Sequence, residues 1–180
     1  MLNEIVTALI RAASGRPCFR IHGRAAGEVD WRTIDIFATH RRDFESRWPL
    51  WRGACITWTS QVIAVGWDFA RTIVEEQSRE PVSREHPLSV FGGRLNDWRP
   101  RVKAGASSQP SASEILAHEC GHTGQAHRWG GLYWPVGGAF TLFREGPHWW
   151  NRFENQASET GQFGGIVNGS VWMERFELGP

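Results

Sequence analysis

The chain has 180 residues, a formal net charge of +1, 41% hydrophobic residues and 22% charged residues. This length supports one domain with a substantial core or two small ones, and the composition excludes a wholly disordered chain. The near-neutral charge leaves no case from composition for nucleic-acid binding, because such proteins usually carry a strong basic excess. No apolar run approaches the roughly 18–20 residues that span a bilayer, so we expect no transmembrane segment.

Cysteine usage and the N-terminal segment predict a cytoplasmic protein. Cys18, Cys55 and Cys120 are far apart and form no CxxC pair, so they are neither a disulfide framework nor a thiolate zinc site. The N-terminal stretch lacks the long apolar centre and the cleavage site of a signal peptide.

The first hundred residues predict one helix and several strands. Residues 2–13 place apolar side chains at helical spacing, so we expect a helix with one face packed on a core. Residues 34–38 alternate as in a short strand. Residues 54–69 are rich in β-branched and aromatic residues, which predicts a strand or a hairpin with a turn near 60–61. A short charged helix is expected over 70–79. We expect this half to supply a sheet with an edge where an extended peptide could pair.

The middle of the chain predicts a boundary. Residues 81–110 hold four prolines and little periodicity, so we expect mostly loop. Residues 103–112 (KAGASSQPSA) have the composition of a linker. We therefore expect an N-terminal α+β part over 1–102, this linker, and a helical metal-binding part over 113–180, within one compact domain.

The clearest helix follows this boundary. Ser113 is a residue type that caps helices, and the helical pattern continues to Trp129, where the pair 130–131 provides two glycines to end it. Residues 132–143 are apolar but broken by proline and glycine, so we expect a loop or a short hairpin. Residues 149–160 predict a second helix.

The run His118-Glu119-Cys120-Gly121-His122 on the first of these helices is an HExxH motif. Residues four apart share a helix face, so His118 and His122 can direct ring nitrogens to one ion at Zn–N distances of about 2.0–2.1 Å. A shift of one residue would turn a ligand by about 100° around the helix. Glu119 can accept a proton from a water that attacks a carbonyl and pass it to the leaving amine. The motif predicts Zn²⁺, for which manganese or cobalt could substitute.

A catalytic zinc usually has three protein ligands and one open position. The candidates for the third ligand are Glu154, Glu159, His127 and, less strongly, His148. On a continuous helix His127 would face away from His118, so it could be a ligand only if Gly124 broke the helix. Glu154 is favoured, because Ala157 leaves a small residue one turn away and lets the second helix lie close to the first.

With these residues the chain resembles the gluzincin group of zincin metallopeptidases, which includes the thermolysin-like enzymes. In this group a glutamate ligand on a downstream helix follows HExxH, often as ExxA or ExxxD. The resemblance covers about residues 113–160. It implies an α+β zincin-like fold in which a small mixed sheet packs on the HExxH helix and on a second helix with the glutamate. It also implies zinc ligands His118, His122 and Glu154, with Glu119 as general base.

The chain departs from this pattern at Ser158, where an aspartate is common. The carboxylate that would orient a ligand imidazole is therefore unassigned, and Glu159 is its candidate. The segment Gly131–Gly137 (GLYWPVG) is also similar to a GxLYxPxxG-like loop of small bacterial HExxH proteins of unassigned function.

Polar residues near the motif could stabilise a developing oxyanion, since metallopeptidases often use His, Tyr or Arg for this purpose. The candidates are His148 and Tyr133, followed by Asn151 and Arg152. Tyr133 could instead be a core ring. We expect a zinc metallopeptidase that acts on a peptide or protein substrate. The alternatives are a catalytically inactive metal-binding module and a protein-interaction module in which HExxH has no role.

Overall fold

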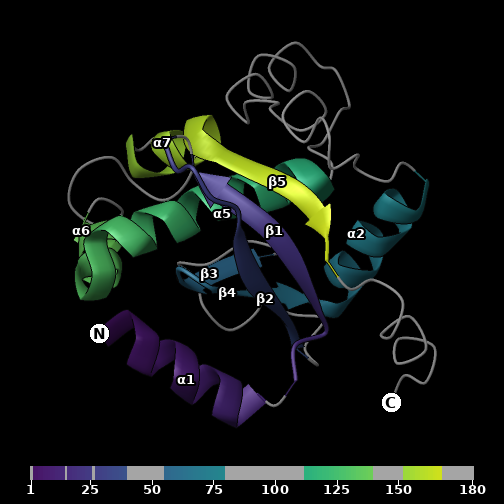
Figure 1. Cartoon of the computed structure of the whole chain (residues 1–180), viewed down its shortest axis with the longest axis horizontal. Coiled ribbons are helices and arrows are strands. Elements are labelled where there is room, and N and C mark those ends of the chain that lie inside the picture. Colours follow the sequence, from purple (N-terminus) through teal and green to yellow (C-terminus); the bar gives the residue numbers. More distant parts are fainter. Residues whose placement is uncertain are drawn as a thin grey trace.

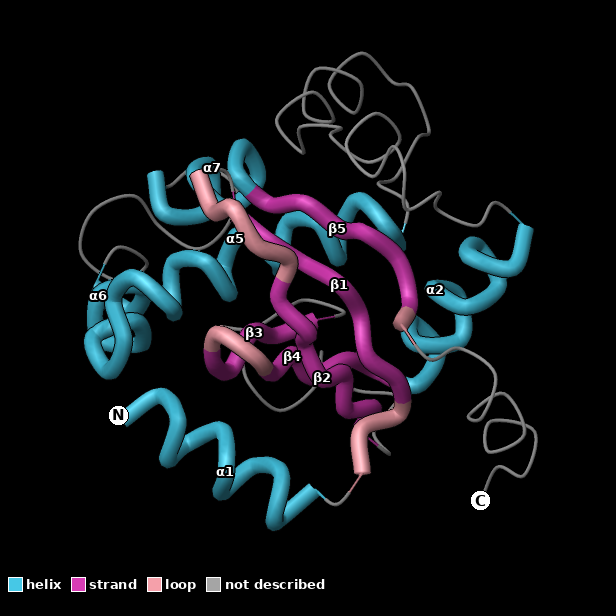
Figure 2. The backbone as a smooth tube through the Cα atoms, in the orientation of Figure 1, coloured by secondary structure: helices cyan, strands magenta, loops and turns pink. Residues whose placement is uncertain are grey.

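The computed structural model describes residues 2–14, 16–25, 27–39, 55–79, 112–139 and 152–167. In these residues a five-stranded mixed sheet lies at the centre and helices surround it (Figures 1 and 2). The strands are β1 (Phe19–Ala25), β2 (Arg32–Thr39), β3 (Cys55–Thr59), β4 (Val62–Gly66) and β5 (Gly161–Ile166). The helices are α1 (Leu2–Ser14), α2 (Trp67–Arg79), α5 (Ala112–Trp129), the 3-10 turn η1 (Gly130–Leu132), α6 (Tyr133–Ala139) and α7 (Arg152–Thr160). The expected α+β class with a small mixed sheet is confirmed.

The strand order is β3-β4-β2-β1-β5, with β2 and β4 parallel and the other neighbours antiparallel. The strand predicted over 34–38 and the hairpin with its turn at 60–61 are confirmed. The hairpin is shorter than expected, because α2 already begins at Trp67. β1 and β5 were not predicted, since arginine and glycine interrupt the β1 sequence FRIHGRA and glycines interrupt the β5 sequence GQFGGI. β5 pairs with β1, so both parts of the chain contribute to one sheet.

The core lies between one face of the sheet and the helices α5 and α2. Ile21, Ile34 and Ile63 from the strands are fully buried, together with Leu116 of α5 and Ile73 of α2. Burying one such side chain contributes about 1.5–3 kcal/mol to stability. Figure 1 shows α5 passing behind β1 and β5, and the sheet therefore buries the HExxH helix as expected.

The helices α5 and α7 are in backbone contact. A Cβ atom at Gly121 would overlap the carbonyl of Ala157, and one at Gly161 would overlap the carbonyl of Ala117. Ala157 is fully buried. Only residues without a larger side chain permit this approach, so the predicted role of Ala157 is confirmed, and Gly121 within HExxH has the matching role.

The helix α1 forms as predicted, but only part of the expected apolar face is covered, with Val6 and Ile10 half-buried. Ile5 and Leu9 were expected on the buried face, yet they are 51% and 64% exposed. The helix instead directs polar side chains toward the sheet, where buried polar partners satisfy them. These contacts include Asn3 Nδ2 to Ser60 Oγ at 3.2 Å, Thr7 Oγ1 to Thr59 Oγ1 at 2.8 Å, and Arg11 Nε to Asp35 Oδ2 at 2.6 Å.

The loop or hairpin predicted over 132–143 was also wrong where the structure describes it, because η1 and α6 are helical. Pro135 lies in the first turn of α6, where a missing backbone N–H costs no helical hydrogen bond. The predictions for 81–111 and 140–151 fall outside the described residues, and Ala112 begins α5. Within the described ranges, none of the helices has the length and apolar character needed to cross a membrane.

The N-terminus of α5 is capped by a carboxylate from α2. Glu76 accepts hydrogen bonds from the backbone N–H groups of Ala112 and Ser113, at 2.9 and 3.0 Å, and from Ser113 Oγ at 3.0 Å. The negative charge is favourable at this helix end. Ser113 thus lies inside the first turn, and the predicted capping residue is replaced by Glu76, which is distant in sequence.

We expect Glu76→Ala to lower the free energy of unfolding by about 1–2 kcal/mol, because two backbone N–H groups lose their acceptor. Glu75→Ala is the matched control, since Glu75 is an exposed neighbour on the same helix. Urea unfolding followed by circular dichroism measures both. Equal losses in the two variants would contradict the capping role.

Candidate metal centre

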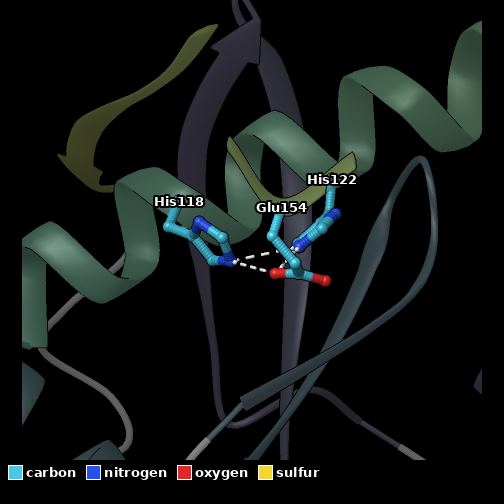
Figure 3. A group of neighbouring side chains, drawn as sticks. All are labelled: His118, His122 and Glu154. Carbon is cyan, nitrogen blue, oxygen red and sulfur yellow. Dashed lines mark hydrogen bonds and ion pairs between the residues drawn. The ribbon is translucent and has the colours of Figure 1, made fainter. Parts of the chain in front are cut away.

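Three side chains converge beside the α5–α7 contact. His118 and His122 come from consecutive turns of α5, and Glu154 comes from α7 (Figure 3). His118 Nε2 and His122 Nε2 each lie 3.1 Å from Glu154 Oε2, and the two Nε2 atoms lie 3.1 Å from each other. Donors at 2.0–2.1 Å from a tetrahedral zinc lie roughly 3.3 Å apart. The triangle therefore has the spacing needed to hold one metal ion, and three donors leave a fourth position of a tetrahedron.

Within the described ranges this is the only group of three His, Cys, Asp or Glu side chains with suitable spacing. Both histidines are buried, and Glu154 is partly buried. His127 is exposed near the end of α5, which runs unbroken through Gly124, and Glu159 is exposed on α7. Of the candidates for the third ligand, the structure brings Glu154 to the histidines, whereas His148 lies outside the described residues.

The hydrogen bonds of Gln125 determine the tautomer of neutral His122. Gln125 Nε2 donates to the backbone oxygen of Phe153 at 2.7 Å and to Gln156 Oε1 at 3.2 Å. Gln125 Oε1 is therefore the acceptor for His122 Nδ1, 2.7 Å away. With Nδ1 protonated, Nε2 keeps its lone pair toward Glu154, which is the arrangement of a metal-ligating imidazole. Gln125 also ties α5 to α7.

Ser158 performs the same task for His118. Its hydroxyl donates to the backbone oxygen of Glu154 at 3.0 Å, so its oxygen accepts from His118 Nδ1 at 2.9 Å. The Nε2 atom of neutral His118 is thereby left unprotonated. The orienting group was expected to be a carboxylate, with Glu159 as its candidate. The structure places Ser158 there instead, at the position where the resemblance implies aspartate.

Glu119, the predicted general base, is buried between α5 and β3. Thr57 Oγ1 lies 2.6 Å from Glu119 Oε2 and donates a charge-assisted hydrogen bond to it. Thr57 belongs to β3, which is the edge strand in the described sheet. Thr57 was not predicted, because a single threonine 62 positions before Glu119 gives no sign of this contact in the sequence.

Tyr133 packs against the metal centre from α6. Its ring lies 6.4 Å from the His122 ring and 5.6 Å from the Phe153 ring, between centroids. Burial, followed by the negative charges of Glu119 and Glu154, raises the pKa of Tyr133 above its ordinary value. The residue is therefore a neutral phenol. Of the other oxyanion candidates, Arg152 is exposed at the start of α7, while His148 and Asn151 lie outside the described residues.

The ligand side chains perturb one another electrostatically. Burial alone would lower the pKa of His122, but the Glu154 carboxylate outweighs it and raises this pKa to about 9. Burial likewise favours a higher pKa for Glu154, yet His122 and His118 hold it well below its usual range. Without a bound cation, His122 therefore carries a proton at neutral pH that a divalent ion would replace.

Comparison of the chain with models of known protein families, with curated proteins and with solved structures gave no match. The interpretation of the centre therefore rests on its residues and their geometry.

Ser158→Ala should weaken zinc binding by about tenfold or more, because His118 Nδ1 loses the acceptor that orients the ring. Thr160→Ala is the matched control. Thr160 Oγ1 makes the same kind of bond one turn back along α7, to the backbone oxygen of Gln156 at 2.7 Å. Competition with a chromophoric chelator measures both affinities. If the two variants bind zinc equally well, the orienting role of Ser158 is wrong.

Zinc uptake should release about one proton at pH 7, because His122, with a pKa of about 9, must lose its proton to become a ligand. The apparent affinity should rise by about tenfold per pH unit up to about pH 9 and level off above it. Calorimetry in buffers of different ionisation enthalpy counts the released protons. An affinity that does not change between pH 6 and pH 9 would contradict this account.

Proposed function

We propose that the protein is a zinc-dependent metallopeptidase that hydrolyses peptide bonds, with a zincin-like arrangement around the metal. The observation that supports this most directly is the convergence of His118, His122 and Glu154 at mutual distances of 3.1 Å. A donor set of two imidazoles and one carboxylate suits zinc, and manganese or cobalt could substitute.

When bound by these three residues, zinc supplies Lewis acidity that makes water nucleophilic near neutral pH. Glu119 provides the proton acceptor. Its Oε2 atom is held by Thr57, and its Oε1 atom accepts no hydrogen bond from the described residues. Oε1 can therefore take the proton of the attacking water and deliver it to the leaving amine.

Among the described residues, Tyr133 is the candidate for stabilising a developing oxyanion, because its ring lies 6.4 Å from the His122 ring between centroids. Its hydroxyl makes no hydrogen bond within the described part of the chain, and its raised pKa keeps the O–H available as a donor. The ring is fixed among His122, Phe153 and Trp134. A donor held in place before the reaction is more effective than one that must reorganise. His148 stays a second candidate for this role.

The edge strand β3 is where we expect a peptide substrate to pair. A peptide that pairs with this strand would satisfy main-chain hydrogen bonds and run beside Thr57, whose hydroxyl holds Glu119. Because pairing uses the peptide backbone, the arrangement suits an extended peptide or protein segment as substrate.

The test combines metal analysis with digestion of a peptide library. The wild type should contain about one equivalent of zinc and cleave peptides. Glu119→Gln should keep the metal and lose activity by at least about a hundredfold, because the proton acceptor is gone. Glu154→Ala should lose zinc, whereas Glu159→Ala, on the same helix, should keep both zinc and activity.

Two outcomes would contradict the proposal in different ways. Zinc below about a tenth of an equivalent after mild purification would remove the metal centre. A zinc-replete wild type that cleaves no peptide, and that behaves like Glu119→Gln, would favour a catalytically inactive metal-binding module.

A further inference from the structure

A tryptophan interrupts the edge strand next to the general base. The β3–β4 ladder pairs Thr57 with Ile63 and Thr59 with Val62, so Trp58 lies at an irregularity without a partner residue on β4. Such bulges turn a side chain or a backbone group away from the ladder. The Trp58 side chain is 41% exposed.

A second tryptophan is bound at this irregularity. Trp134 of α6 donates its indole N–H to the backbone oxygen of Trp58 at 3.0 Å. The two rings lie 5.5 Å apart between centroids and are tilted by 49°, within the range of favourable aromatic pairs. A side chain of another element therefore occupies a main-chain acceptor of the edge strand.

Trp58 and Trp134 each follow a residue that contacts the metal centre. Thr57, which precedes Trp58, holds Glu119. Tyr133, which precedes Trp134, packs against His122. A peptide paired with β3 beside Glu119 would therefore meet the pair within about one residue.

The contacts of Trp134 are those that a substrate residue would make. A peptide strand on β3 offers a backbone N–H to the Trp58 oxygen, and its side chain can lie against the Trp58 ring. We propose that Trp134 occupies the place of a substrate residue on β3, and that a peptide with an aromatic side chain at this position displaces it. This inference rests on the proposed peptidase function and names its substrate class.

The peptide replaces the hydrogen bond and the Trp58 ring contact that Trp134 gives up, whereas the contact of Trp134 with the Tyr133 ring, 5.5 Å away between centroids, is not replaced. An alanine at the same position replaces the hydrogen bond alone. Trp134 also competes with every peptide for this place. The apparent affinity of a peptide is its intrinsic affinity multiplied by the fraction of molecules in which Trp134 is already displaced. Removing Trp134 should therefore strengthen peptide binding instead of weakening it.

The experiment measures binding in the Glu119→Gln background, so that the readout does not depend on turnover. The probes are an end-blocked pentapeptide of four alanines around a central phenylalanine, and the all-alanine pentapeptide. Trp134→Phe, which removes the N–H and keeps a ring, should bind the phenylalanine peptide about two- to tenfold more tightly. Trp134→Ala, which removes both, should bind it at least about tenfold more tightly. Trp129→Phe, an exposed tryptophan on α5, is the control with unchanged affinity.

Two further measurements make the result specific. The phenylalanine peptide should shift the indole N–H resonance of Trp134 in Glu119→Gln. Trp58→Leu should remove the preference for phenylalanine over alanine.

Weaker or unchanged binding in both Trp134 variants, with zinc content intact, would overturn the inference while leaving the peptidase proposal in place. A wild type that cleaves nothing, combined with tighter binding in the Trp134 variants, would overturn the peptidase proposal alone. Binding of neither peptide by any variant would overturn the inference, while the library digest alone decides the peptidase proposal.

Discussion

The backbone contact between α5 and α7 is the constraint on which the candidate metal centre depends. Two histidines on one helix can be arranged by local geometry, but the third donor must come from another element. Gly121 and Ala157 let that element approach until backbone atoms touch, and Glu154 then reaches both imidazoles at 3.1 Å. A larger residue at either position would separate the helices and withdraw the carboxylate.

Hydrogen bonds to the two imidazoles determine which ring nitrogens face Glu154. Gln125 and Ser158 each bind the Nδ1 atom of one imidazole, and each also bonds to the backbone of α7. The two residues that set the imidazole tautomers thus also join the helices, Gln125 through Phe153 and Ser158 through His118. Thr57 extends this arrangement to the sheet, because it donates from β3 to Glu119, the neighbour of His118 on α5.

The parts of this structure that sequence could predict are those determined by local spacing. The HExxH helix, the hairpin turn at 60–61 and the close approach at Ala157 follow from neighbouring residues alone. The contacts that could not be predicted join distant residues whose types are common. Thr57 and Glu119 are 62 positions apart. The exposure of Ile5 and Leu9 was not predicted, because the polar side chains of α1 meet distant partners at the end of β3 and on the β3–β4 turn. The glycine-rich β5 gains its strand conformation from pairing with β1.

The direct passage from α7 into β5 has a consequence for how the carboxylate ligand is located. Thr160 ends the helix and Gly161 begins the strand, with no loop between them. Gly161 both contacts α5 and pairs with Ala25 of β1. Rotating α7 would therefore require the main-chain ladder of β5 to break. The pairing of β5 with β1 therefore fixes the position of Glu154. Substitutions at the outward-facing residues of α7 can change the surface without moving this carboxylate.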